Sequence, residues 1–288
     1  MTSPVLLLLR DPSGATGHDA VAADQPVALA TDLGITRGDG IFETITVVDG
    51  IPQALDAHLT RLAHSAALLE LPRPHEPAWR EAVFAAIDAH DEVAEAFIKL
   101  VYSRGIEGSG VPTGWVWLQP SADFTRERTE GIDVVLLDRG YASTIATTAP
   151  WLLQGAKTLS YALNRAAIRE AARRGADDAL FVSTDGYLLE GPTANVLLRL
   201  DGRIVTPKTD LGILAGTTQQ SIFEIAQVNG YPTSYELLTP ADLMRADAAW
   251  LVSSVRNAAP IRSVDGVARA IDAELTQSIN AGLAARTA

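Results

Sequence analysis

Apolar positions along the chain follow two spacings in turn, the every-second-residue spacing of strands and the three-to-four-residue spacing of helices. Residues 41–48 are rich in β-branched side chains and end at Asp49-Gly50, a dipeptide that favours a tight hairpin turn. Asp185-Gly186 and Asp201-Gly202 indicate two more hairpins. The later strands are predicted over 96–102, 114–118, 132–137, 179–183, 187–190, 195–200, 203–206 and 250–254. Hairpins this frequent argue against a doubly wound parallel sheet.

The first long helix is predicted from Asp56, as its N-cap, to Leu69. The apolar stripe of this helix consists of Leu59, Leu62, Ala66 and Leu69. His58, Arg61 and Ser65 lie on another face of the same helix. Further helices are predicted over 78–90, from near Ser160 to just before Gly175, and from Gly216-Thr217-Thr218 to about Val228.

A polar stretch that contains Pro120, residues 119–130, is predicted to link two domains. Residues 1–118 then form a small N-terminal α/β domain, and residues 131–288 form a larger C-terminal domain. The predicted fold class is therefore mixed α/β (α+β) in two domains.

The net charge of the chain indicates which classes of molecule it can bind. The chain has 23 Lys and Arg against 35 Asp and Glu, a net charge of −12. A surface this acidic repels nucleic-acid phosphates and anionic lipid, and no basic cluster overrides it. The apolar run at 5–9 is too short for a signal-peptide core, and no stretch reaches the roughly 18–20 apolar residues that span a bilayer. We expect a cytoplasmic protein that binds a small molecule, and neither nucleic acid nor membrane.

Cysteine is absent, which excludes disulfides, thiolate metal sites and cysteine nucleophiles. The five histidines form neither an HExxH nor an HxH arrangement, and no EF-hand loop occurs, so no metal site is expected. GxSxG, GxGxxG and P-loop motifs are absent as well. A Ser/His/Asp triad and a nucleotide-binding site therefore both lack their usual sequence signatures.

Only three of the basic residues are lysines, namely Lys99, Lys157 and Lys208. Lys157 lies among apolar and small residues just before a predicted helix. A desolvated amine there has the lowered proton affinity that a Schiff-base lysine needs. The alternative is a surface lysine whose stem lies along its apolar neighbours. Lys99, inside a strand, and Lys208, in a loop, look structural.

Three other positions have both a chemical and a structural interpretation. Glu190 ends an apolar strand, where its carboxylate could pair with a protonated ring nitrogen or simply meet solvent. The Gly216-Thr217-Thr218 helix start suits an anion, and equally an ordinary N-cap. Arg61 could donate two hydrogen bonds to a phosphate or cover its own helix.

Pyridoxal phosphate requires an imine partner, a partner for its ring nitrogen and a site for its phosphate. The sequence offers, in this order, an amine, a carboxylate 33 residues later and a Gly-Thr-Thr helix start. The sequence resembles the class IV (fold type IV) pyridoxal-phosphate enzymes, which include branched-chain aminotransferases, D-amino-acid transaminases and 4-amino-4-deoxychorismate lyases. The matching motifs are Gly38-Asp39-Gly40-Ile41-Phe42-Glu43-Thr44, His58-Leu59-Thr60-Arg61-Leu62, Lys157-Thr158-Leu159-Ser160-Tyr161 with Asn164, Glu190-Gly191-Pro192-Thr193-Ala194-Asn195, Leu214-Ala215-Gly216-Thr217-Thr218 and Ser253-Ser254.

The resemblance implies pyridoxal 5′-phosphate as cofactor, with Lys157 forming the imine and acting as the catalytic acid and base, and Glu190 pairing with the pyridine nitrogen. The other implied cofactor-binding residues are Arg61, Thr217, Thr218 and Ser254 at the phosphate, Tyr161 at the phenolic oxygen and Asn195 as a support. The implied fold is a small α/β domain followed by a larger pseudo-barrel domain that binds the cofactor. The implied assembly is a homodimer in which residues of one subunit close the other's site.

Within this family the sequence looks closest to 4-amino-4-deoxychorismate lyases, which release 4-aminobenzoate, a folate precursor, and pyruvate. The segment 102–110 resembles the lyases' Ser-Arg-Gly segment and lacks the Arg-x-His of D-amino-acid transaminases. Glu43, where some lyases carry threonine, instead matches transaminases. The candidate substrate-binding residues are Glu43, Tyr102, Arg104 and Arg256. The alternatives are a transaminase of branched-chain or D-amino acids, and an inactive cofactor-binding protein.

Overall fold

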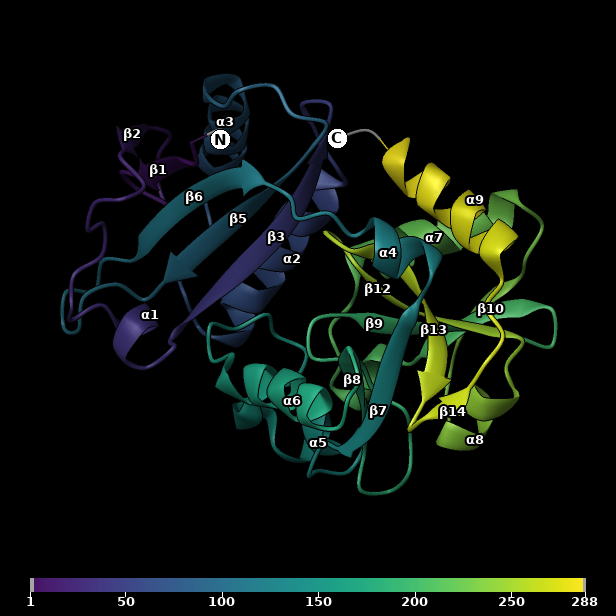
Figure 1. The fold of residues 1–288 in the computed structure, drawn as a ribbon. Helices are drawn as coiled ribbons and strands as arrows, with labels where there is room; N and C mark the ends of the chain where they lie inside the picture. The colour runs from purple at the N-terminus through teal and green to yellow at the C-terminus, as the bar shows by residue number, and fades with distance from the viewer. Residues whose placement is uncertain (1–2, 287–288) are drawn as a thin grey trace. The chain divides into compact units, whose positions relative to one another are not determined.

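The computed structural model describes residues 3–286, which form two units of sheet and helix (Figure 1). Of the described residues, unit 1 contains 3–122, the segment Ala156–Tyr161 and Arg286. Unit 2 contains Asp123–Gly155 and Ala162–Ala285. The change between units at Ala122 falls inside the stretch predicted as a linker. The segment 156–161, placed by sequence in the C-terminal domain, belongs to unit 1.

Unit 1 is built on a six-stranded sheet with the order β2-β1-β6-β5-β3-β4. Its strands are β1 (Val5–Leu9), β2 (His18–Val21), β3 (Gly40–Val48), β4 (Ile51–Pro52), β5 (Glu95–Ser103) and β6 (Thr113–Pro120). All neighbouring strands are antiparallel. The turn at Asp49-Gly50 joins β3 to β4, so the hairpin predicted there is confirmed.

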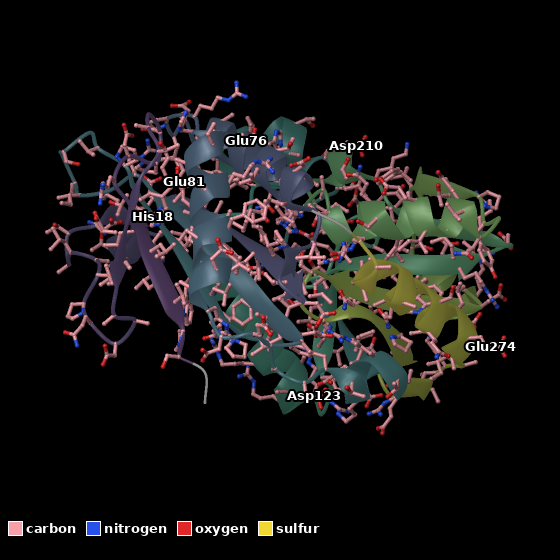
Figure 2. The ribbon with its side chains drawn as sticks, turned by 90° about the horizontal axis from the view of Figure 1, so that it is seen from above. His18, Glu76, Glu81, Asp123, Asp210 and Glu274 are labelled. Atoms are coloured by element: carbon pink, nitrogen blue, oxygen red, sulfur yellow. The ribbon has the colours of Figure 1, made fainter. Side chains whose placement is uncertain are left out.

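Two helices cover one face of this sheet. The helices of unit 1 are α1 (Leu33–Thr36), α2 (Leu55–Leu68) and α3 (Glu76–Ala89). Helix α2 contacts β3, and α3 contacts β1 and β6. Beside α3, Nδ1 of His18 lies 3.4 Å from Oε1 of Glu81 (Figure 2).

The predicted N-cap of α2 is wrong. Ala54 occupies that position in a left-handed conformation with φ of 53°, and no side chain caps the helix. Asp56 lies instead in the first turn, where an acidic side chain favours the helix dipole, and it pairs with Arg80 at 2.6 Å. The predicted apolar stripe is buried as expected, and His58 and Ser65 are buried as well.

Unit 2 is built on an eight-stranded sheet with the order β11-β10-β9-β12-β13-β7-β8, with β14 beside β13. Its strands are β7 (Ile132–Asp138), β8 (Asp178–Val182), β9 (Asn195–Leu200), β10 (Arg203–Pro207), β11 (Thr233–Glu236), β12 (Ala248–Ser253), β13 (Asn257–Val264) and β14 (Val267–Ala268). The β10–β11, β13–β7 and β7–β8 pairs are parallel and the others antiparallel, so the sheet is not doubly wound.

The strand predicted over 187–190 is wrong. This segment forms only an isolated bridge between Val182 and Leu188, flanked by backbone hydrogen bonds from Ser183 N–H to the Tyr187 carbonyl at 2.8 Å and from Leu189 N–H to the Phe181 carbonyl at 2.9 Å. Phe181 N–H still donates to the carbonyl of Glu190 at 2.9 Å. That bond fixes the backbone of Glu190 against β8.

The helices of unit 2 are α4 (Thr125–Thr129), α5 (Ile145–Thr148), α6 (Ala162–Arg173), α7 (Thr217–Val228), α8 (Pro240–Arg245) and α9 (Ala273–Ala284), with 3-10 turns η1 (Pro150–Leu152) and η2 (Thr209–Leu211). Helix α4 lies in the stretch predicted as a linker, where Arg128 donates to the carbonyls of Val255 and Arg256. Helix α6 begins two residues later than predicted. Helices α7 and α9 pack on the sheet, over a core that includes Ile222, Trp250 and Ile279. Among residues 3–286, no helix is long and apolar enough to cross a membrane.

Candidate active site

The segment that carries Lys157 runs along the first half of β3. Phe42 N–H donates to the Lys157 carbonyl at 3.0 Å, and Leu159 N–H donates to the Gly40 carbonyl at 2.8 Å. On the other side, Lys157 N–H donates to Ser65 Oγ of α2 at 3.2 Å. The backbone of Lys157 is thus held by both β3 and α2.

The amine of Lys157 packs on an aromatic ring. Its Nζ lies 4.5 Å from the centroid of Phe42, and the Tyr161 ring meets Phe42 edge-on at 5.3 Å. Lys157 is partly buried. Contact with an aromatic face orients an ammonium group while limiting its hydration. Lys157, Phe42 and Tyr161 are therefore brought together within unit 1.

Arg61 is held by a carboxylate that is completely buried. Its Nε lies 2.8 Å from Oε1 of Glu43, and its second terminal nitrogen lies 2.7 Å from Oε2. His58 Nδ1 lies 2.7 Å from the same Oε2. These two-point contacts fix the plane of the guanidinium group. Glu43 is 0% exposed and Arg61 only 9%, so the pair is shielded from water.

The protonation states of this cluster follow from its contacts. Burial alone would raise the pKa of Glu43, but the charge and hydrogen bonds of Arg61 outweigh it and hold the pKa well below its ordinary value of 4.5. Burial lowers the pKa of His58 below 6.5, helped by the nearby charges of Arg61 and Lys157. Glu43 is therefore ionised and His58 neutral near pH 7, with His58 donating from Nδ1.

In unit 2, Glu190 is held by the loop before α7. Leu214 N–H donates to Oε2 of Glu190 at 3.1 Å, and the amide nitrogen of Asn195 lies 3.4 Å from the same oxygen. Asn195 also donates to the Leu214 carbonyl at 2.9 Å. The expected supporting role of Asn195 has a geometric counterpart here, because its amide links Glu190 to the loop.

Helix α7 begins where the sequence predicts, with Gly216 as its N-cap. Thr217 and Thr218 are buried in its first turn, and Thr218 Oγ1 has no hydrogen-bond partner among the described residues. A Cβ on Gly216 would lie 2.0 Å from Oδ1 of Asn195, so the backbone approaches Asn195 more closely than any larger residue allows. Backbone N–H groups, the helix dipole and an unsatisfied hydroxyl together suit an anion.

Ser254 follows β12 and is partly buried in unit 2. Tyr141, which sequence reasoning missed, lies near Glu190, whose charge contributes to raising the pKa of the Tyr141 phenol after the larger effect of burial. Arg139 Nε donates to the phenol oxygen at 2.9 Å, and the phenol donates to Gln154 at 2.5 Å. No sequence motif marks this group. The sequence placed His58 on the helix face of Arg61 but gave it no role.

Each of the four candidate substrate-binding residues forms a hydrogen bond or ion pair with a residue of its own unit. Glu43 binds Arg61, and the buried Tyr102 donates its hydroxyl to the Pro72 carbonyl at 2.9 Å, with burial raising its pKa to about 12. Arg104 lies 2.6 Å from Asp39. Arg256 lies 2.8 Å from Asp178. These contacts argue for structural roles, most clearly for Glu43 and Tyr102, which are 0% exposed.

Comparison with known proteins identifies the family to which this chain belongs. The family model for class IV amino-transferases matches residues 40–264. A curated Mycobacterium tuberculosis protein named bifunctional aminodeoxychorismate lyase / D-amino acid transaminase is 44% identical over 84% of this chain and 87% of its own length. The structure of the fold IV transaminase CpuTA1 from Curtobacterium pusillum is 54% identical, with a TM-score of 0.96 over 99% of this chain and 100% of that one.

A structure of an aminotransferase from M. tuberculosis in its PLP-bound form is 39% identical, with a TM-score of 0.90 over 97% of this chain and 98% of that one. The residues present fit that cofactor. Thr218 offers an unpartnered buried hydroxyl at a helix N-terminus, which suits a phosphate, and Glu190 is an acceptor fixed in place. Lys157 supplies the primary amine. The chain therefore belongs to the class IV aminotransferase family, the fold type IV enzymes that depend on pyridoxal 5′-phosphate.

Proposed function

We propose that this enzyme is a lyase that converts 4-amino-4-deoxychorismate into 4-aminobenzoate and pyruvate. The observation that carries the proposal is its 44% identity, over 84% of the chain, to a protein named for this lyase activity and for D-amino acid transamination. The Ser103-Arg104-Gly105 segment, which resembles the lyases, supports the same choice. The second candidate is a transaminase of D- or branched-chain amino acids, supported by the 54% identity to a fold IV transaminase.

In this proposal the cofactor-binding residues are assigned the roles that their motifs imply. Pyridoxal phosphate supplies an electron sink that lowers the energy of a carbanion at the substrate carbon. Lys157 would hold the cofactor through its primary amine, and its Nζ would move the proton of the substrate carbon. Glu190 would accept the hydrogen bond of the cofactor's ring nitrogen and would keep that nitrogen protonated.

The family motifs assign the phosphate group to Arg61, Thr217, Thr218 and Ser254. Arg61, oriented by Glu43, donates charge-assisted hydrogen bonds to it. Thr217 and Thr218 donate from the first turn of α7, and Ser254 adds a hydroxyl. Tyr161 hydrogen-bonds the phenolic oxygen of the cofactor. A phosphate dianion at a helix N-terminus is favoured by the helix dipole as well as by hydrogen bonds.

Glu43 does not supply the leaving-group proton in this proposal. Some lyases have a threonine at this position, but here the carboxylate is buried, ionised and bound by Arg61 and His58. An acid whose pKa lies this far below neutrality holds no proton to give. The enolpyruvyl group therefore takes its proton from another source, and Lys157 Nζ is the assigned donor.

The decisive experiment incubates the holoenzyme with 4-amino-4-deoxychorismate and measures 4-aminobenzoate by its fluorescence and pyruvate in equal amount. A parallel panel pairs D- and L-amino acids with 2-oxoglutarate or pyruvate. We expect 4-aminobenzoate release to be the fastest reaction. Fast amino-group exchange without 4-aminobenzoate would reverse the order of the two candidates, and absence of both would leave a binding protein.

Lys157→Ala tests the role assigned to Lys157, and Lys208→Ala is its control. The purified enzyme should be yellow, and Lys157→Ala should lose the visible absorption and the activity together. Lys208→Ala, which removes an exposed lysine at the end of β10, should keep both. An unchanged spectrum in Lys157→Ala would remove Lys157 from its assigned role.

We also propose that the enzyme is a homodimer, as the family resemblance implies. Sedimentation equilibrium of the holoenzyme should give twice the mass of 30.6 kDa. A monomer at micromolar concentration with full activity would refute this assembly.

A further inference from the structure

The segment that carries Lys157 pairs with β3 at the bridge between Ile41 and Thr158. Next to this bridge, Phe42 N–H donates to the Lys157 carbonyl at 3.0 Å. In a regular antiparallel ladder two such residues exchange both bonds, so Lys157 N–H would donate to the Phe42 carbonyl in return. Lys157 N–H instead donates to Ser65 Oγ of α2 at 3.2 Å. The ladder therefore ends at Lys157, where the backbone turns from the strand toward the helix.

Ser65 is placed for this contact by the packing of α2. Its side chain is 0% exposed, and it follows His58 and Arg61 at the spacing of one helix face. Helix α2 packs beside β3 (Figure 1). One turn before Ser65, Arg61 contacts Glu43 of β3 at 2.8 Å. The same face of α2 thus fixes both the guanidinium group of Arg61 and the backbone of Lys157.

The bond to Ser65 constrains the residue from which the amine extends. The carbonyl side of Lys157 is bound to β3 and its N–H side to Ser65, so both backbone torsion angles of Lys157 are restricted. A lysine side chain is a flexible four-carbon stem, so a small rotation at Cα moves Nζ by a larger distance. In the observed orientation Nζ lies 4.5 Å from the Phe42 centroid. An N–H group that loses its acceptor at a buried surface costs free energy, so removal of the Ser65 hydroxyl favours movement of this segment.

We propose that Ser65 is a positioning residue for Lys157, whose hydroxyl ends the ladder with β3 and thereby aims Nζ at the reacting carbon. This inference rests on the proposed role of Lys157. It applies to the lyase and to the transaminase alike, because both move a proton through this amine. In this proposal Ser65 acts only through Lys157.

The test separates the position of the amine from a general loss of stability. Ser65→Ala removes the acceptor, and Ser65→Cys fills a similar volume with a sulfur that accepts hydrogen bonds only weakly. Thr276→Val is the matched control, because Thr276 is 3% exposed and its Oγ1 accepts from Trp250 Nε1 at 2.8 Å in unit 2. All three variants lose a buried acceptor, so urea denaturation should show a lower stability in each.

Cofactor binding gives a measurement that needs no turnover. Pyridoxal phosphate and pyridoxal share the aldehyde that Lys157 would hold, and only the first carries a phosphate. Equilibrium dialysis of the full-length enzyme should therefore show the Kd of both compounds rising by the same factor in Ser65→Ala, about tenfold. Ser65→Cys should resemble Ser65→Ala, and Thr276→Val should resemble the wild type.

Kinetics supply the second measurement, on whichever reaction the wild-type holoenzyme catalyses. In Ser65→Ala the kcat should fall about 10- to 100-fold with KM changing less, because a displaced amine slows proton transfer rather than substrate binding. The protons on Nζ exchange with solvent, so the ratio of kcat in H₂O to kcat in D₂O should rise as this step limits the rate. A loss of stability alone leaves that ratio unchanged, as Thr276→Val should show.

Wild-type Kd values and a wild-type isotope effect in Ser65→Ala would overturn the proposal. Recovery in Ser65→Cys would do the same, because packing rather than the hydrogen bond would then position the segment. So would a loss confined to pyridoxal phosphate, which would place the effect at Arg61, or equal changes in Thr276→Val.

Failure of the proposed function is distinguished by other variants and products. Absence of 4-aminobenzoate in the wild type removes the lyase, and retained visible absorption in Lys157→Ala removes the role of Lys157. Neither result depends on the Ser65 variants, whose visible absorption at saturating cofactor confirms that each is folded and loaded.

Discussion

A carboxylate that pairs with the cofactor's ring nitrogen should affect the reaction barrier more than the affinity for the cofactor. Glu190 is held by Leu214 N–H and by Asn195. Glu190→Ala should retain the cofactor through Lys157 and the phosphate contacts, but turnover should fall on the order of 100-fold, because the ring nitrogen loses the charge that keeps it protonated. Stopped-flow turnover and the visible spectrum measure the two effects. Wild-type rates in this variant would refute the assignment.

Glu43 is expected to act through Arg61 as a positioning residue. Glu43→Gln keeps the shape of the side chain and removes the charge that fixes the guanidinium. The Kd for pyridoxal phosphate should rise about tenfold, while the Kd for pyridoxal, which has no phosphate, should change far less. Glu81→Gln, on the exposed side of α3, is the control. Equal changes for both ligands would mean that Glu43 serves the fold alone.

At the residue scale, motif spacing picked out the candidate catalytic residues and missed the residues that contact them. Lys157, Glu190 and Thr218 are visible in the sequence because each stands in a short motif. The same motifs gave Glu43 a substrate role that its burial argues against, and they gave no hint of Tyr141 near Glu190. Partners of a charged group come from distant parts of the chain, which local patterns do not report.

The start of α7 offers a prediction at the element scale. Gly216 has φ of −76°, which alanine also adopts, so the main obstacle to Gly216→Ala is the 2.0 Å approach of its Cβ to Oδ1 of Asn195, with Cβ of Gln219 a further contact at 3.1 Å. This variant should displace Asn195, loosen Glu190 and weaken cofactor binding about tenfold, measured by titration of the visible absorption. Gly216→Ala combined with Asn195→Ala removes the clash. If both variants bind the cofactor as the wild type does, the close approach has no role.

Elements with strong periodicity were predicted well, and those defined by pairing were not. The apolar stripe of α2 and the hairpin after β3 were found because their spacing and turn residues are local. The segment 187–190 has a strand-like composition, but it forms only one bridge to β8, with backbone hydrogen bonds on either side of it. Helix α4 lies in a polar stretch, and its Arg128 contacts with residues 255 and 256 come from sequence positions far away.

The stability of the whole molecule should depend on pH through the buried cluster at Arg61. The folded-state pKa of His58 is lowered, so the unfolded chain binds its proton first, and the free energy of unfolding should fall as pH drops below 6.5. The pKa of Glu43 is lowered as well, so a second loss should begin near 4.5. Urea denaturation from about pH 7 to about pH 4 measures both. His58→Gln should flatten the first part of the curve, and an unchanged slope would contradict the assignment.

The sequence by itself determined the family, the cofactor, the mixed α/β class and most of the elements, because motifs, periodicity and turn residues are properties of neighbouring positions. Tertiary structure decided that 156–161 belongs to unit 1, that Glu43 neutralises Arg61, and that Lys99 shares the ring of Phe42 with Lys157. These facts depend on which strands pair and in which register. A one-residue shift between β3 and β5 would turn Lys99 to the opposite face, so its place beside Phe42 depends on this register.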